Sequence, residues 1–194
     1  MVEAIKKVFE DNYKDCYCSI KEIAFDENNK EYPIDKEYLF LDFDLKLVNR
    51  YFPKQGIKSI DTIDFQGDNI NFIEFKNGDI KSQDKMAIKL KGIESLLTFF
   101  EIIKNKNIAS DFKEIFNYNI NYYVVLNKDK NSDYFNPIRD RLNFNEKLAR
   151  LYPDYENTYF KKVEVLSFEQ FKDFYLDKYY QKQKEVILWI VMKH

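Results

Sequence analysis

Two short runs of strand-forming residues, joined by a two-residue turn, constrain the fold of this chain more than any other feature. The runs are Lys58 to Gln66 and Asn69 to Lys76, and Gly67 and Asp68 lie between them. A two-residue connection that begins with glycine is typical of a type II′ β-hairpin. The sequence therefore predicts an antiparallel hairpin, in which the turn determines which residues of the two strands face each other.

The pattern that follows the hairpin predicts how the sheet continues. Ser82 to Asn105 is expected to form a long helix, and Ile120 to Leu126 a buried strand. A strand, a helix and a strand in this order favour a right-handed crossover onto a parallel neighbour. The helical residues expected to face the core recur at steps of three and four: Met86, Leu90, Ile93, Leu97 and Phe100.

Shorter patterns predict the remaining elements. Ser167 and Gln170 form a capping-box pattern that indicates the start of a helix running through Phe171, Phe174 and Tyr175. Further helices are expected at Val2 to Asn12, Tyr38 to Phe52 and Leu142 to Leu151. Further strands are expected at Tyr17 to Phe25, Lys162 to Leu166 and Glu185 to Met192.

The composition predicts one folded domain covering residues 1–194. The chain has 194 residues, of which 45% are hydrophobic and 33% charged, which is the balance of a globular protein. Four glycines and four prolines leave little room for long loops. Together with the patterns above, these values predict an α/β (α+β) fold with a mixed central sheet and flanking helices.

Histidine and cysteine usage excludes several classes of active site. The only histidine is His194, the last residue, so a Ser-His-Asp or Cys-His centre, a histidine-ligated zinc and an HNH-type nuclease are not expected. Cys16 and Cys18 lie too close in sequence for an unstrained disulfide, and we expect two reduced thiols in a cytoplasmic protein. No signal peptide or membrane-spanning run is recognised, so no membrane partner is expected.

The hairpin register nominates a group of charged residues. With Gly67 and Asp68 in the turn, Asp61 faces Glu74, and Lys76 follows Glu74 by two residues. Side chains alternate along a strand, so Asp61, Glu74 and Lys76 project from one face of the sheet. The nearer acid, Asp64, projects from the other face.

Two carboxylates that face each other across a sheet repel and require a neutralising partner. A divalent cation such as Mg²⁺ takes hard oxygen ligands, often one or two carboxylates with water. We therefore consider Asp61 and Glu74 as metal ligands, the backbone carbonyl of Phe75 as a further ligand, and Lys76 as a group that stabilises developing negative charge. The alternative is a solvated hairpin face with an incidental ion pair.

The stretch from Asp61 to Lys76, DTIDFQGDNINFIEFK, resembles the central motif of the PD-(D/E)XK nuclease superfamily, which includes restriction endonucleases. The resemblance covers the order of elements from Lys58 to Leu126. It implies a restriction-endonuclease-like core with N- and C-terminal elaborations. It also implies Mg²⁺- or Mn²⁺-dependent hydrolysis of phosphodiester bonds, with DNA as the substrate and phage defence as one setting. Asp61 and Glu74 would hold the metal, and Lys76 would assist catalysis.

Two features leave alternatives open. Ile60 stands where many members have proline, and the acid that many members carry on an earlier helix has three candidates here, Glu10, Asp42 and Asp44. The rival hypothesis is a catalytically inactive protein on the same scaffold, acting as an interaction, immunity or defence-system partner. A protein partner or a second copy of the chain would suit that role.

A local basic patch is required for a nucleic-acid partner, because the net charge of the whole chain is −2. Lys81, Lys85 and Lys89 recur at steps of four and share one helix face, which is either a phosphate-contacting ridge or a solvated surface. Several aromatic residues are expected to pack in the core and not to stack on bases: Tyr122, Tyr123, Phe171, Phe174 and Tyr175.

Overall fold

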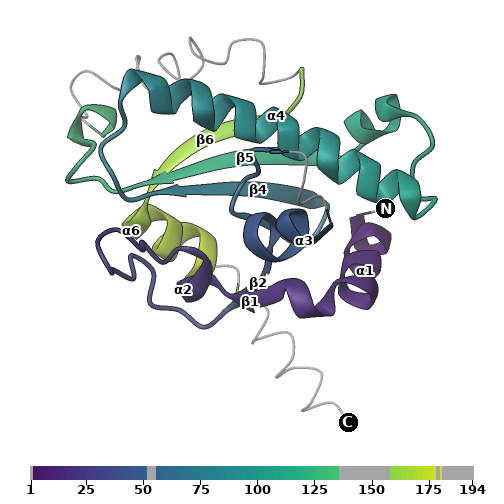
Figure 1. The fold of residues 1–194 in the computed structure, drawn as a ribbon, viewed down its shortest axis with the longest axis horizontal. Coiled ribbons are helices and arrows are strands. Elements are labelled where there is room, and N and C mark those ends of the chain that lie inside the picture. The colour runs from purple at the N-terminus through teal and green to yellow at the C-terminus, as the bar shows by residue number, and fades with distance from the viewer. Residues whose placement is uncertain (1, 52–55, 136–157, 178–179, 181–194) are drawn as a thin grey trace.

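The computed structural model describes residues 2–51, 56–135, 158–177 and 180. Within these residues the chain forms a mixed, six-stranded sheet with strands in sequential order from β1 to β6 (Figure 1). This is the predicted α/β architecture. The strands are β1 (Tyr17–Ser19), β2 (Leu39–Asp42), β3 (Thr62–Gln66), β4 (Asn69–Lys76), β5 (Asn119–Leu126) and β6 (Lys162–Ser167). The helix predicted at Leu142 to Leu151 and the strand predicted at Glu185 to Met192 lie outside the described residues.

Helices cover both faces of the sheet. The α-helices are α1 (Val2–Asn12), α2 (Ile20–Ile23), α3 (Asn49–Tyr51), α4 (Ser82–Asn105) and α6 (Phe168–Gln170). Shorter 3₁₀ or π-helical segments are η1 (Lys14–Cys16), η2 (Phe43–Val48), η3 (Phe112–Asn117), η4 (Ser132–Tyr134) and η5 (Phe171–Asp177). Among the described residues, no helix is both long and apolar enough to cross a membrane.

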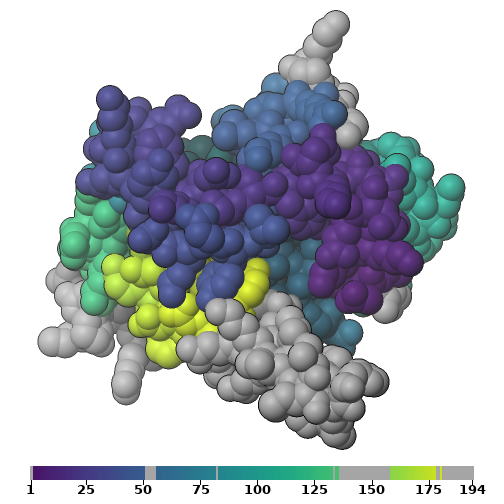
Figure 2. Space-filling model, turned by 90° about the horizontal axis from the view of Figure 1, so that it is seen from below, coloured from purple at the N-terminus to yellow at the C-terminus, as the bar shows by residue number. Residues whose placement is uncertain are grey.

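The core is divided by the sheet into two hydrophobic clusters. One cluster joins α1, η2 and α4 to the sheet face that carries Ile63 and Phe72. The other joins α2, α6 and η5 to the face that carries Ile73 and Phe75. The second face also brings distant parts of the chain together. Figure 2 shows the C-terminal segment, coloured yellow, against a dark blue segment of the N-terminal part. Lys36, in the N-terminal part, pairs with Asp177, in the C-terminal segment, at 2.8 Å.

The register of the hairpin and the parallel pairing of β5 with β4 are as predicted, but the first strand is shorter than predicted: β3 begins at Thr62 and not at Lys58. Thr62 pairs with Ile73 and Gln66 with Asn69, so the register is the one that the turn implies. Gly67 has a φ of +56°, which glycine adopts without strain and a type II′ turn requires at this position. Helix α4 has the predicted bounds and leads into β5, which runs parallel to β4.

The helix predicted at Tyr38 to Phe52 is wrong in its first part. Leu39–Asp42 is strand β2, which pairs with both β1 and β3, and the helical segment starts at Phe43. The Asp42 carboxylate accepts hydrogen bonds from the backbone N–H groups of Leu45 and Lys46 at 2.9 and 3.2 Å, and so caps η2.

The strand predicted at Tyr17 to Phe25 is too long. It ends at Ser19, because the Ser19 hydroxyl accepts a hydrogen bond from the Glu22 N–H at 3.2 Å and caps α2. The capping box of Ser167 and Gln170 is present as predicted.

The predicted core face of α4 is wrong at Met86, Leu90 and Leu97, whereas Phe100 is buried as predicted. Met86 and Leu97 are exposed by 57% and 49%, whereas Phe99 and Ile103 are fully buried. The helix is apolar on more than one side, so its periodicity does not decide which side packs. The sheet decides it at Gly92: an added Cβ would lie 3.0 Å from the Tyr122 ring, which reaches α4 only because glycine leaves that space.

The aromatic residues follow the core prediction with one exception. Tyr122 and Phe171 are fully buried, Tyr175 is buried, and Tyr123 is half-buried, as core packing requires. Phe174 is 69% exposed, so the prediction is wrong for that residue. Its neighbours in η5 turn toward the sheet, and Phe174 is left on the outer side of this segment.

Candidate functional site

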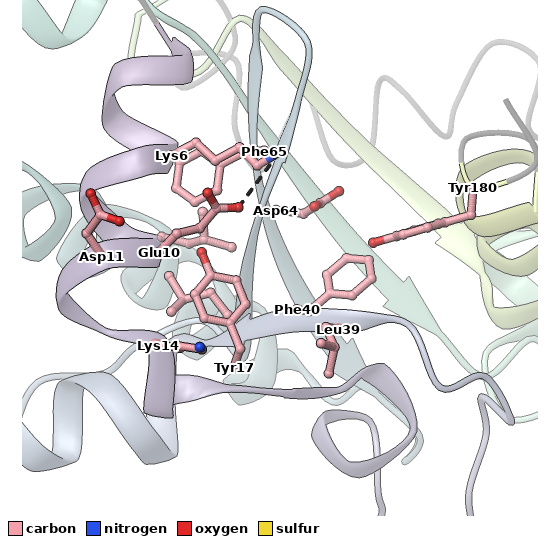
Figure 3. A pocket seen from close by; sticks show the side chains of 12 residues that line it. Lys6, Glu10, Asp11, Lys14, Tyr17, Leu39, Phe40, Asp64, Phe65 and Tyr180 are labelled. Atoms are coloured by element: carbon pink, nitrogen blue, oxygen red, sulfur yellow. Dashed lines mark ion pairs between the residues drawn. The ribbon is translucent and has the colours of Figure 1, made fainter. Parts of the chain in front are cut away.

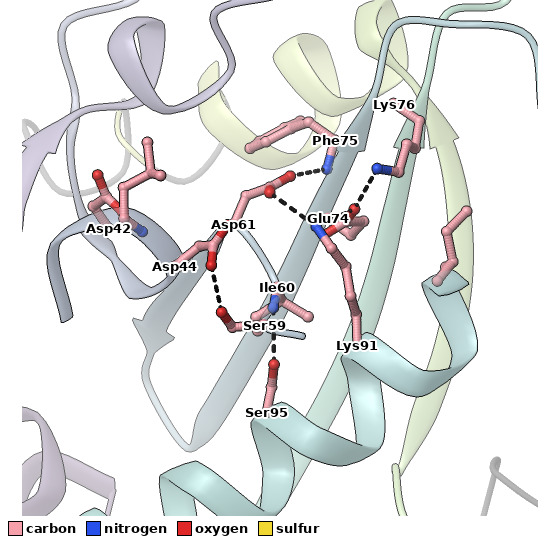
Figure 4. A network of polar contacts seen from close by, with 12 residues as sticks. Asp42, Asp44, Ser59, Ile60, Asp61, Glu74, Phe75, Lys76, Lys91 and Ser95 are labelled. Carbon is pink, nitrogen blue, oxygen red and sulfur yellow. Dashed lines mark hydrogen bonds and ion pairs between the residues drawn. The ribbon is translucent and has the colours of Figure 1, made fainter. Parts of the chain in front are cut away.

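The sheet brings Asp61 and Glu74 to one place. Asp61 directly precedes β3, and its Oδ2 accepts a hydrogen bond from the backbone N–H of Phe75 at 2.6 Å. Glu74 lies on β4, and its side chain has no exposed surface. The Asp61 side chain is 21% exposed. Both carboxylates therefore lie on the face covered by α4, at the edge of its hydrophobic cluster (Figure 4).

Helix α4 also positions the segment before β3. The N–H of Lys58 donates to the Glu94 carboxylate at 2.6 Å, and the N–H of Ile60 donates to the Ser95 hydroxyl at 2.8 Å. Side chains of the helix thus take the place of a strand partner for these N–H groups. This arrangement places Asp61 beside the helix and opposite Glu74.

A lysine that the sequence reasoning missed lies between the two carboxylates. The Nζ of Lys91, on α4, lies 2.8 and 3.0 Å from the two Glu74 oxygens and 3.5 Å from Asp61 Oδ1. The Nζ of Lys76 lies 2.9 Å from Glu74 Oε1. Two carboxylates and two ammonium groups meet here, so their formal charges cancel. We call these four residues, Asp61, Glu74, Lys76 and Lys91, the charge cluster.

Lys91 was missed because the predicted core face of α4 lay on another side of the helix. It lies one turn after Ile88 and one turn before Ser95, and both of these are buried against the sheet. Residues three and four apart share a helix face. A correct assignment of the buried face would therefore have directed Lys91 toward Glu74.

The electrostatics of the charge cluster favour a cation between the acids. Burial, and then the charge of Glu74, raise the pKa of Asp61 well above its usual range, against the opposing effects of Lys91 and the Phe75 N–H. Burial alone would lower the pKa of Lys91, but the charges of Asp61 and Glu74 outweigh it and raise that pKa above its ordinary value. Lys91 is therefore an ammonium at neutral pH.

The three candidates for a further acid lie in different places. Asp44 lies next to Asp61 in Figure 4, where it accepts a hydrogen bond from the Ser59 hydroxyl. Asp42 is buried and serves as the cap of η2. Glu10 pairs with Lys6 at 3.9 Å and lines a different pocket. In the described part of the chain, no group of three or more Asp, Glu, His or Cys side chains gathers closely enough to hold a metal.

The donor set of the cluster suits a hard divalent cation on one condition. Oxygens of Asp61 and Glu74 already surround one positive charge, and Mg²⁺ commonly takes two carboxylates and completes its shell with water. The N–H and C=O of a strand residue point to the same side, so the Phe75 carbonyl faces the Asp61 side of β4. Mg–O distances are about 2.0–2.1 Å, so the ion fits only where the Lys91 ammonium withdraws.

The lysines proposed as a phosphate ridge lie along the first half of α4. Lys81 is exposed, and Lys85 and Lys89 are half-buried. The Lys85 Nζ lies over the ring of Tyr134, at 5.5 Å from its centre. Lys85 and Lys89 thus lie on the helix and Lys81 caps its start, and Lys85 has a local partner there.

A second polar site lies apart from the charge cluster, beside α1. It is a cavity of about 600 Å³, where α1 meets the ends of β2 and β3 (Figure 3). Asp64 lies in its wall and accepts a hydrogen bond from the Tyr175 hydroxyl at 2.9 Å. The Tyr17 hydroxyl, also in the wall, is buried with no hydrogen-bond partner among the residues that the structure describes. Asp64 is thus separate from the charge cluster, as the register predicts.

Replacing Asp64 with asparagine is expected to stabilise the protein at pH 7.5 by about 1–3 kcal/mol. Burial raises the pKa of Asp64 to about 6, above the value of about 3.9 in an unfolded chain. The folded state therefore binds more protons between these values, and stability falls as the pH rises from about 4 to about 6. Asparagine still accepts the Tyr175 hydrogen bond but carries no charge.

Urea unfolding followed by circular dichroism at pH 4.5 to 8 measures this effect. The Asp64→Asn variant should lose the part of the pH dependence between pH 4.5 and 6.5 that Asp64 contributes, while the part due to Asp61 remains. The exposed turn residue provides the matched control, since Asp68→Asn should leave the pH profile unchanged. A destabilised Asp64→Asn variant at pH 7.5 would show that the carboxylate is needed in its charged form.

Comparisons with protein-family models, curated proteins and solved structures find no match to this chain. The fold and the geometry of the charge cluster therefore carry the functional argument.

Proposed function

We propose that this protein is a Mg²⁺- or Mn²⁺-dependent nuclease of the PD-(D/E)XK type that hydrolyses phosphodiester bonds of DNA. The observation that carries the proposal is that Asp61, directly before β3, and Glu74, on β4, converge on the Lys91 ammonium beside Lys76. The order β3, turn, β4, α4 and parallel β5 supports it, because it is the order of elements in the resemblance.

Each residue of the cluster has a role in this mechanism. Asp61 and Glu74 would hold the metal, and the hydrogen bond from the Phe75 N–H orients Asp61. The metal supplies charge neutralisation of the phosphate and activation of a water molecule. Lys76 is 34% exposed, so its ammonium reaches a bound phosphate and stabilises the charge that develops there. Water adds to phosphorus and the bond to one ester oxygen breaks; one proton of the water passes to the leaving oxygen and the other to solvent.

The cellular setting belongs to the same proposal. We place the nuclease in the cytoplasm, because Cys16 and Cys18 are buried free thiols, which reducing conditions maintain. Lys81, the N-cap residue of α4, and Lys85 and Lys89 on the helix precede Lys91, and they supply the local positive charge that a nucleic-acid backbone needs. A role in phage defence, alone or with a protein partner, is consistent with this activity.

One observation favours the non-catalytic alternative. Glu74 has no exposed surface, and Lys91 already neutralises it. A protein that uses the charge cluster only to fix β4 against α4 would need no metal. It would act through an interaction surface, as an immunity or defence-system partner.

DNA cleavage with and without metal distinguishes the two functions. Purified protein is incubated with supercoiled and linear DNA in the presence of Mg²⁺, of Mn²⁺ or of EDTA. The nuclease proposal requires nicked or linear product with metal and none with EDTA. The Lys76→Ala variant, purified identically, should leave the DNA intact. Equal cutting by the variant would reveal a contaminant, and no cutting by the wild type would favour the alternative.

A further inference from the structure

We propose that Lys91 is an internal competitor of the metal: its ammonium holds Asp61 and Glu74 in place until a divalent cation and a phosphate displace it. This inference rests on the proposed metal site and adds a step that controls its occupancy. The supporting observation is the position of the Lys91 Nζ, which lies within 3.5 Å of both carboxylates.

The geometry makes the two cations mutually exclusive. The Lys91 Nζ donates hydrogen bonds to both Glu74 oxygens, at 2.8 and 3.0 Å, and lies 3.5 Å from Asp61 Oδ1. A Mg²⁺ or Mn²⁺ ion bound by these oxygens would lie at about 2.0–2.2 Å from them and would occupy the space of the ammonium. The site therefore has two states, one with Lys91 between the acids and one with a metal there.

The charge balance indicates what must accompany the exchange. With Lys91 in place, the two carboxylates and two ammonium groups have a formal charge of zero. A divalent ion added beside Lys91 would leave two positive charges in a site where Glu74 is fully buried, which is costly. With Lys91 withdrawn the excess is one charge, and one phosphodiester anion neutralises it. Substrate and metal should therefore bind cooperatively.

Lys91 has a place to go within reach of its own helix. The side chain is 19% exposed, so it is not enclosed by the core. Asp44, which lies next to Asp61, contributes to the charge that acts on Lys91. Rotation about the bonds of its flexible four-carbon side chain moves the ammonium toward solvent and Asp44, while the backbone of α4 stays in place. Near that position it also remains available to a phosphate oxygen.

The competition predicts an effect opposite to that of an ordinary supporting residue. Replacing Lys91 by methionine removes the competing charge and keeps a side chain of similar length. The variant should bind Mn²⁺ at least about tenfold more tightly than the wild type, because the metal no longer displaces an ammonium. A lysine that only supports a metal site would, when removed, weaken metal binding or leave it unchanged.

Calorimetric titration with Mn²⁺, together with thermal melts in its presence, tests the inference without measuring cleavage. Wild type, Lys91→Met and Lys91→Gln are compared, with Lys104→Met as an exposed control on the same helix. The proposal is supported if both Lys91 variants bind Mn²⁺ more tightly than the wild type and the double variant Glu74→Gln/Lys91→Met does not bind it. Equal or weaker binding by folded Lys91 variants, while the wild type binds, overturns the inference and leaves the metal site standing. No binding by any of them ends both.

The wild type provides a measurement that does not depend on the stability of a variant. The ammonium of Lys91, held by two carboxylates, should give a slowly exchanging NMR signal in the absence of metal. Addition of Mg²⁺ with a short DNA duplex should abolish that signal, whereas Mg²⁺ alone should reduce it less. A signal that survives saturating metal and DNA would contradict the displacement of Lys91.

Discussion

Substituting Glu74 with glutamine is expected to reduce metal-dependent DNA cleavage at least about 100-fold, the magnitude typical for loss of one group that stabilises developing charge at a reaction centre. Glutamine keeps the shape of the side chain but supplies no negative charge to a divalent ion. Asp61→Asn should have a comparable effect, since Asp61 is the other carboxylate that faces the same cation. Initial rates of plasmid nicking at several Mg²⁺ concentrations measure the loss.

The matched control for this experiment is the acid on the other face of the sheet. Asp64→Asn changes the same chemical group three residues from Asp61, but Asp64 contacts Tyr175 and lies away from the charge cluster. Its cleavage rate should stay within about twofold of the wild type. If Glu74→Gln cuts DNA as fast as Asp64→Asn, the cluster has no catalytic role and the nuclease proposal fails.

Removing the Glu74 carboxylate entirely is expected to lower the free energy of unfolding by about 3–5 kcal/mol, as when one partner of a buried ion pair is deleted. Glu74→Ala leaves Lys91 and Lys76 facing each other with no opposing charge from β4. It also leaves an empty space beneath α4. Urea unfolding at pH 7.5, followed by circular dichroism, measures the change. Glu101→Ala, at an exposed position of α4, should cost far less.

A double-mutant cycle assigns this cost to Lys91. Glu74→Gln and Lys91→Met should each destabilise the protein, and the double variant should be more stable than the sum of the two costs implies by about 1–3 kcal/mol. The reason is that, in the double variant, neither position 74 nor position 91 carries a buried charge that lacks its partner. Strictly additive costs would mean that the 2.8 Å contact between Lys91 and Glu74 contributes nothing to stability.

Local chemistry allowed several elements to be predicted in detail. The Gly67–Asp68 turn determines the register of β3 and β4, because a two-residue hairpin leaves one pairing only. Helix α4 and strand β5 are long and continuous in pattern, and both were found where expected. Alternation along the strands was sufficient to place Asp61 and Glu74 on one face of the sheet and Asp64 on the other.

Long-range competition decided the elements that were predicted wrongly. Tyr38 to Phe52 has helical spacing throughout, but Leu39–Asp42 pairs with strands on both sides, and hydrogen bonding to β1 and β3 outweighs a local preference. The exposed Met86 and Leu97 show the same effect on α4, where the Tyr122 ring against Gly92 selects the buried side.

The sequence by itself determined the pair of facing acids and the elements that carry them, because strand alternation and turn length are properties of consecutive residues. Only the tertiary structure decided which cation faces those acids. Lys91 is 17 residues from Glu74 in sequence, and its direction depends on the rotation of α4 about its own axis. That rotation is set by packing against the sheet, which no local pattern encodes.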